Sequence, residues 1–250
     1  MLKVLGYTGK KFSEFINSVI LFFQFLGELT DHILNNWQQV IWKHTIIANL
    51  RLGASILFPI MLISMLIGMG MAISIQLILA PYHLQQEAMV IAETSLLRDF
   101  APFTIGFVLC VHCGLNLIDK DHPSLNKPPH IVLLETIVPL IVGLNFTAIS
   151  LYTYVFASFL LSVFFISYYV VHTNIAEYLY RLSHIINSYE LFNSLLKTLG
   201  YTTLASLITG YYYYGVAYKV ISTRVAVSRV ITRNLFWLVI VSVLLKLVMR

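Results

Sequence analysis

Charged residues are scarce in this chain. Asp, Glu, Lys and Arg together make up 11% of its 250 residues, whereas hydrophobic residues make up 58% and the mean hydropathy is +0.81. A soluble globular domain carries roughly a quarter charged residues, so this composition excludes an ordinary soluble fold. The sequence therefore predicts an integral membrane protein.

Cysteine is also rare. The only two lie in Cys110-Val111-His112-Cys113, which excludes a disulfide framework but offers thiolate and imidazole ligands that suit zinc or copper. On a helix these side chains spread over a wide arc, and no second pair of ligands lies nearby in the sequence. Free cysteine is often buried as a small hydrophobic residue, so we predict no metal site here.

Motifs for hydrolysis and for phosphate binding are missing. No Ser/His/Asp or paired-carboxylate arrangement suggests hydrolysis, and we predict no catalytic residue. The segment Gly6-Tyr7-Thr8-Gly9-Lys10 ends in Gly-Lys, but a phosphate-binding loop needs four residues between its glycines and a Ser or Thr after the lysine. The net charge of +5 lies in short loops between apolar segments, so it does not indicate a nucleic-acid partner. We therefore predict that the chain is not an enzyme and binds no cofactor itself.

Long uncharged segments dominate instead. About 20 apolar residues in a helix cross a bilayer, and five segments reach or approach this length. They are residues 52–86, 100–118, 131–172, which only Glu135 interrupts, 198–218 and 234–245. The predicted fold class is all-α, a polytopic bundle of about five transmembrane helices. A break of the third segment near residues 143–150, where Gly143 and Asn145 lie, would raise the count to six.

Lysine and arginine gather at alternate ends of these segments. Lys120 and Lys127 follow the second segment and four basic residues lie at 219–233, whereas residues 81–92 contain neither type. Short loops rich in Lys and Arg stay cytoplasmic. This asymmetry favours five spans with a cytoplasmic N-terminus, because six spans would move the basic loop at 219–233 to the outside.

Residues 12–42 differ from the later segments because polar residues interrupt them. Apolar residues such as Phe12, Phe15 and Ile16 recur at helical spacing, with Glu14 among them. This pattern predicts a helix that lies in the membrane interface. The alternative is a first transmembrane helix over residues 16–34. We divide the chain into a cytoplasmic N-terminus with an interfacial helix (1–45) and a transmembrane domain (46–250).

One charged pair, Arg98-Asp99, precedes the apolar run of the second segment. Charged residues inside a membrane are costly and usually mark a working site or a tightly paired structural one. Small residues also recur in the first segment, where Gly68 follows Ser64 and Ser74 follows Gly70 at a spacing of four. Small side chains let membrane helices approach closely.

Three motifs in a consistent order resemble a known family. They are Leu66-Ile67-Gly68-Met69, then Ser95-Leu96-Leu97-Arg98-Asp99 with Pro102, and Ala226-Val227-Ser228-Arg229-Val230-Ile231-Thr232-Arg233. Together they look like the MlaE/YrbE permeases, the membrane subunits of ABC-type lipid transporters that work with MCE proteins. The resemblance covers nearly the whole chain.

The resemblance implies a lipid path or gate beside Arg98 and Asp99, with Asp99 standing where the family usually has Glu. The first transmembrane helix would line this path. Its candidate lining residues are Gly68, Met71, Ser74 and Gln76. Ser74 departs from this resemblance because it stands where the family usually has Gln. The other interpretation of Arg98 and Asp99 is that they only pair with each other or with neighbouring helices.

The cytoplasmic side departs from the family. His112 replaces the arginine of the family's Ala-Gly-Arg-x-Gly, and residues 119–129 are shorter than expected and contain three prolines in seven residues, which cannot form a regular helix. We therefore predict that the coupling helix, which docks on the ATPase, is missing. The candidates for a cytoplasmic or ATPase-facing surface are Asp119, Lys120, Arg224, Ser228, Arg229 and Arg233.

The implied function is that of a permease subunit in an MCE-associated lipid transporter of the bacterial inner membrane, with phospholipid as its cargo. Its partners would be an ABC ATPase that binds ATP and Mg, an MCE-domain protein, and a second permease copy or paralogue. The shortened coupling segment favours the weakly coupled half of a heterodimer, and a homodimer is the next hypothesis. The alternative from another class is a non-transporting membrane scaffold derived from a permease.

Overall fold

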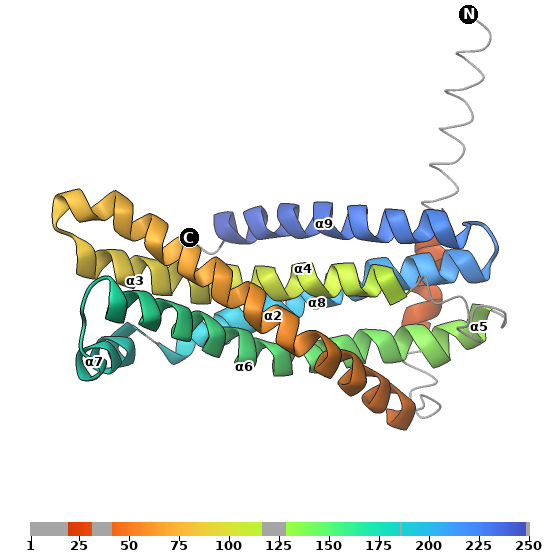
Figure 1. Cartoon of the computed structure of the whole chain (residues 1–250). Helices are drawn as coiled ribbons and strands as arrows, with labels where there is room; N and C mark the ends of the chain where they lie inside the picture. Colours follow the sequence, from red (N-terminus) through yellow and green to blue (C-terminus); the bar gives the residue numbers. More distant parts are fainter. Residues whose placement is uncertain (1–19, 32–41, 117–128, 186, 249–250) are drawn as a thin grey trace, which may run out of the picture.

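The computed structural model describes residues 20–31, 42–116, 129–185 and 187–248, and every regular element within these ranges is helical. Residues 20–31 form a first helix. The later helices are α2 (Trp42–Leu79), α3 (Gln85–Ser95), α4 (Ala101–Asn116), α5 (Pro129–Val132), α6 (Val138–Tyr169), α7 (Ile175–Ile185), α8 (Ser188–Ala217) and α9 (Thr223–Val248). They lie mostly along one common direction (Figure 1). The predicted all-α bundle is confirmed.

Four stretches of helix among the described residues are long and apolar enough to cross a membrane. They are Gly53–Tyr82, Glu87–Leu115, Leu133–Tyr169 and Thr223–Leu247. The predicted span at residues 198–218 is helical within α8, but serine, threonine and tyrosine lower its hydropathy, so it is not among the four. Helix α8 packs against α4, α6 and α9 (Figure 1). Its polar side chains can therefore face other helices instead of lipid.

Two predicted boundaries change. The second span begins earlier than residue 100, because α3 starts at Gln85 and continues through a π turn into α4. Most of the predicted loop at residues 81–92 is therefore helical. Helix α6 runs without a break through residues 143–150, so the third span is not divided there and the proposed sixth span does not form at this point.

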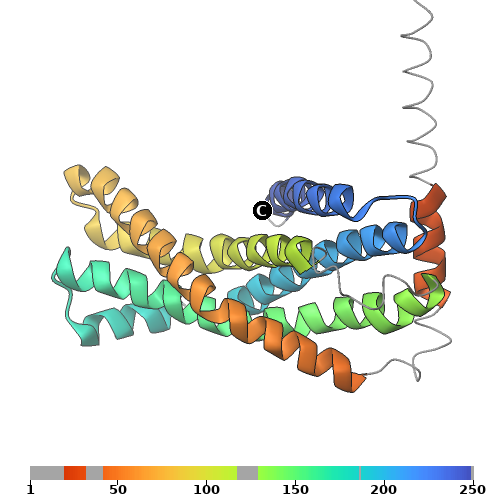
Figure 2. The same ribbon diagram turned by 45° about the vertical axis from the view of Figure 1, so that its right-hand side comes forward.

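The helix at residues 20–31 lies across one end of the bundle (Figure 2). Leu21, Phe25 and Leu29 are buried there against the last turns of α8. The ring centroid of Phe25 lies 5.6 Å from that of Tyr214. This crosswise direction favours an interfacial helix over a transmembrane one, while the rest of the predicted helix, at 12–19 and 32–41, lies outside the described residues.

Two π turns interrupt the long helices, and each comes just before a proline. These are η3 (Leu96–Phe100), before Pro102, and η5 (Leu133–Ile137), before Pro139. Proline lacks an N–H donor, and its ring clashes with the carbonyl four residues earlier. A π turn relieves this clash by shifting hydrogen bonds to the carbonyl five residues earlier, as from Ala101 N–H to the Leu96 oxygen. Both turns share the sequence Leu-Leu-charged-x-x-x-Pro.

Helices α2 and α6 pack closely through glycine. Gly68 is buried, and a Cβ atom added to it would overlap Ser162 Oγ and lie 3.0 Å from Phe159 Cδ1. Gly70, two residues later, faces open space. Gly68 thus serves a close helix contact within one subunit.

We expect Gly68→Ala to lower the free energy of unfolding by roughly 1–3 kcal/mol, because the new methyl group overpacks the α2–α6 contact. Gly70→Ala is the matched control and should be neutral or slightly stabilising, since alanine favours helix and meets no neighbour. Unfolding of the purified variants in detergent measures both effects. Equal stabilities for the two variants would contradict the packing described here.

Candidate functional site: a charged cluster around Asp99

Asp99 joins three parts of the bundle. It lies on η3, where its Oδ1 atom is 3.2 Å from Lys197 Nζ of α8 and its Oδ2 atom is 3.2 Å from Lys246 Nζ of α9. Each carboxylate oxygen thus has its own ammonium partner. Asp99 therefore forms ion pairs with neighbouring helices, as the interpretation of Arg98 and Asp99 as a structural pair expects.

The two lysines differ in exposure. The Lys197 side chain is 4% exposed and that of Lys246 is 64% exposed, with Asp99 between them at 27%. A buried ammonium group depends strongly on its counterion, because water cannot stabilise its charge. The exposed Lys246 pair is worth much less. Lys197–Asp99 is therefore the structural pair, whereas Lys246–Asp99 is the contact that breaks easily.

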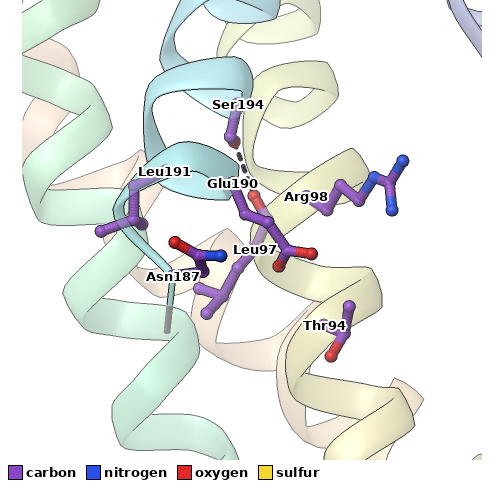
Figure 3. Close-up of a pocket in the computed structure, with 7 residues that line it drawn as sticks. All are labelled: Thr94, Leu97, Arg98, Asn187, Glu190, Leu191 and Ser194. Carbon is purple, nitrogen blue, oxygen red and sulfur yellow. Dashed lines mark hydrogen bonds between the residues drawn. The ribbon is translucent and has the colours of Figure 1, made fainter. Parts of the chain in front are cut away.

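The π turn also explains the hydrogen bond from Ser194 of α8 to the backbone of η3. In a π turn the Leu97 carbonyl would accept from residue 102, but this residue is proline and has no N–H. The hydroxyl of Ser194 on α8 donates to the Leu97 oxygen instead, at 2.7 Å (Figure 3). Ser194 therefore supplies a hydrogen bond that Pro102 removes, and it fixes η3 against α8.

A small cavity lies beside this contact (Figure 3). Its volume is about 20 Å³, which is room for about one water molecule. Its lining residues are Thr94, Leu97, Arg98, Asn187, Glu190, Leu191 and Ser194. The guanidinium group of Arg98 points away from the other labelled side chains. In this conformation the cavity can hold a water molecule, but it has no room for a lipid headgroup.

The other candidates for the lipid path lie apart from this cavity. Gly68 is buried at the contact with α6, and Met71 packs against the apolar core. Ser74 is exposed and donates to the Gly70 carbonyl at 2.7 Å. Gln76 is buried, and its Oε1 atom has no hydrogen-bond partner among the described residues. None of these four lines the cavity beside Arg98.

The candidates for the cytoplasmic surface fall into two groups. Asp119 and Lys120, with the predicted missing coupling helix, lie outside the described residues. The other four, Arg224, Ser228, Arg229 and Arg233, are exposed on the first three turns of α9. Lys246 lies 13 residues beyond Arg233, about 20 Å along the helix at 1.5 Å per residue. The basic turns and the Asp99 cluster therefore occupy opposite ends of α9.

Helix α8 forms further polar contacts with α6 and α9 that no sequence motif indicates. Asn145 of α6 accepts hydrogen bonds from the hydroxyls of Thr202 at 2.8 Å and Thr203 at 3.1 Å. Asn234 of α9 donates to Thr209 Oγ1 at 3.3 Å. These contacts satisfy polar side chains between helices, so Asn145 serves packing in this conformation.

A second buried carboxylate, Glu93 of α3, lies nearer the α7 end of the bundle. It is 3% exposed, hydrogen-bonds to Tyr178 of α7 and interacts electrostatically with Arg181. Burial raises the pKa of Tyr178 above its usual range, and the charge of Glu93 adds to this effect. The Tyr178 hydroxyl also lies 3.1 Å from the Leu160 carbonyl of α6. These bonds fasten α7 to α3 and α6.

Within the part of the chain that the structure describes, no cluster of three or more His, Cys, Asp or Glu residues could hold a metal ion. Cys110 and Cys113 are both free and buried. Their thiols pack among apolar neighbours of the bundle.

No protein-family model matches the sequence, and no curated protein matches it.

We expect Asp99→Asn to lower the free energy of unfolding by roughly 3 kcal/mol, because it leaves the Lys197 ammonium group buried without a counterion. Lys246→Gln should cost less than about 1 kcal/mol, since that lysine is exposed. The double variant Asp99→Asn/Lys197→Met should recover most of the loss. Denaturant unfolding in detergent measures the cycle, and additive effects of Asp99→Asn and Lys197→Met would refute the pairing.

Proposed function

We propose that this chain is the permease subunit of an MCE-associated, ABC-type lipid transporter. The observation that supports this best is the Asp99 cluster. Arg98-Asp99 belongs to one of the three motifs that carry the resemblance to MlaE/YrbE permeases. It lies on a π turn, and Asp99 is bound to two further helices of a membrane bundle. Ionisable residues inside a bundle are costly and by default mark a functional site, and π turns occur often at such sites.

The cluster would act as the gate of the lipid path. Lys246 is exposed, so its bond to Asp99 breaks first when α9 moves away from α8. The buried Lys197–Asp99 pair keeps η3 on α8 during this motion. Arg98 and the exposed Asn187 line the cavity between η3 and α8, and if this cavity widened, the Arg98 guanidinium group could turn into it and bind the phosphate of a headgroup together with Asn187.

The chain would depend on partners for energy and for the delivery of lipid. A separate ABC ATPase would bind ATP and Mg and hydrolyse the nucleotide, and an MCE-domain protein would receive or supply phospholipid. A second permease copy or paralogue would complete the dimer. The family resemblance places the assembly in the bacterial inner membrane. We infer a cytoplasmic N-terminus because the basic residues of α9 lie at the end of the bundle that carries the helix at residues 20–31.

Lipid transfer in vesicles that contain the purified complex tests this proposal. We expect Asp99→Asn/Lys197→Met to reduce transfer at least tenfold, because it removes the charged gate while it avoids a buried unpaired ammonium group. The control is Glu177→Gln, which removes a carboxylate from the exposed i,i+4 pair with Arg181 and should leave transfer unchanged. Co-purification of the partners shows whether each variant still assembles.

Two outcomes would contradict the transporter. If the double variant assembles and transfers lipid as fast as the wild type, the cluster is not the gate; if transfer is lost only because the partners no longer co-purify, the cluster serves assembly and the chain is a scaffold. If purification through this chain yields a stable dimer without an ATPase, the transporter role is wrong in its usual form.

A further inference from the structure

A row of two arginines and a tryptophan runs along α9 from its second turn to just past its middle. Arg229, Arg233 and Trp237 follow one another at a spacing of four, so they lie on one side of the helix. All three side chains are exposed. The first turn of α9 contains no acidic residue.

The two guanidinium groups lack an acidic neighbour on their own helix. Like charges four residues apart repel each other. The residues three and four positions from Arg229 or Arg233 are apolar, threonine or the other arginine. Glu28, from the helix that packs on the same end of α8, accepts a hydrogen bond from Tyr218 at 3.5 Å. An external anion between Arg229 and Arg233 would remove their repulsion.

A buried hydroxyl lies beside the same arginines. Tyr212 of α8 is 1% exposed, and its hydroxyl has no hydrogen-bond partner among the described residues. The guanidinium carbon of Arg233 lies 5.6 Å from the centroid of the Tyr212 ring. Both Arg229 and Arg233 interact electrostatically with this phenol. Two cations and an unused donor therefore meet at one place, and an oxyanion is the group that all three can bind.

The neighbouring aromatic residues indicate where this anion comes from. Phe236 and Trp237 form an edge-to-face pair with centroids 6.2 Å apart, and both rings are exposed. Trp237 lies one turn beyond Arg233, about 6 Å further along the helix and inside the candidate span Thr223–Leu247, so it can contact the part of a lipid below a phosphate that binds at the arginines. Guanidinium groups bind phosphate through paired hydrogen bonds. We infer that Arg229, Arg233 and Tyr212 bind the phosphate of an anionic phospholipid, whose glycerol and upper acyl region contact Trp237.

This lipid site is separate from the proposed transport gate. It lies at the opposite end of α9 from Lys246, and it does not depend on the transport function. The basic residues of α9 lie on two different sides of the helix, with Arg229 and Arg233 on one side and Arg224 on the other. At about 100° per residue, Arg224 points about 140° away from Arg229 and 180° away from Arg233. Arg224 remains free for another contact and provides a matched control.

The experiment measures thermal unfolding of the purified full chain in neutral detergent with added short-chain phosphatidylglycerol or phosphatidylcholine. Phosphatidylglycerol should stabilise the wild type at concentrations at least tenfold lower than phosphatidylcholine. Arg229→Gln/Arg233→Gln should abolish this preference, and Tyr212→Phe should weaken it severalfold. Arg224→Gln, which also removes one positive charge from α9, should retain the preference.

Each other result overturns the inference. An equal loss in Arg224→Gln would show diffuse attraction to the basic turns, and stabilisation by inorganic phosphate at the same concentration would show a free-anion site. Absence of any preference in the wild type would exclude the site. If the double variant does not fold, Arg233→Gln alone decides, because retention of the full preference by that variant contradicts the inference.

Discussion

The carboxylate of Asp99 constrains the arrangement of three helices. A charge between the helices of an apolar bundle is costly to desolvate and is stabilised by counterions at hydrogen-bond distance. Lys197 and Lys246 supply them from α8 and α9. The buried Lys197 limits how far α8 can slide past η3, whereas the exposed Lys246 holds α9 only weakly. Apolar contacts cannot set this register alone, because lipid tails solvate apolar side chains as well as another helix does.

Pro102 adds a second constraint at the same place. It removes a donor, the chain responds with a π turn, and the turn leaves the Leu97 carbonyl without a helical partner. Ser194 satisfies this carbonyl from α8. The proline, the π turn and the ion pair therefore all require α8 beside η3. The polar character of α8 fits this position between helices. Ser194, Thr202, Thr203 and Thr209 bond to neighbouring helices, whereas Thr198 and Ser206 donate to carbonyls of α8 itself.

The sequence predicts the bundle better than it predicts the site. Uncharged runs identify the apolar spans, because lipid-facing helices must be apolar over their whole length. Helix α8 is less apolar than the candidate spans because neighbouring helices cover it. The hydropathy pattern of the sequence does not reveal this packing. Arg98-Asp99 stands out as a costly pair, but Lys197 lies 98 residues from Asp99 and only the packing brings them together. The repeated Leu-Leu-charged-x-x-x-Pro pattern accompanies both π turns, but only the structure shows that it marks them.

Helix α9 is the span most free to move. It is the least buried of the four candidate spans, so few contacts along its length oppose displacement. Polar bonds hold it near its C-terminal end, from Lys246 to Asp99 and between Ser242 and Tyr201, and at its middle, from Asn234 to Thr209. The ion pair is exposed and weak, whereas the Asn234 bond is buried and flanked by Arg233 on Tyr212. A lipid phosphate bound at Arg229 and Arg233 would strengthen the contact around Asn234 further. Motion of α9 would then pivot near its middle and, once the Ser242–Tyr201 bond also breaks, open the bundle at the Asp99 end.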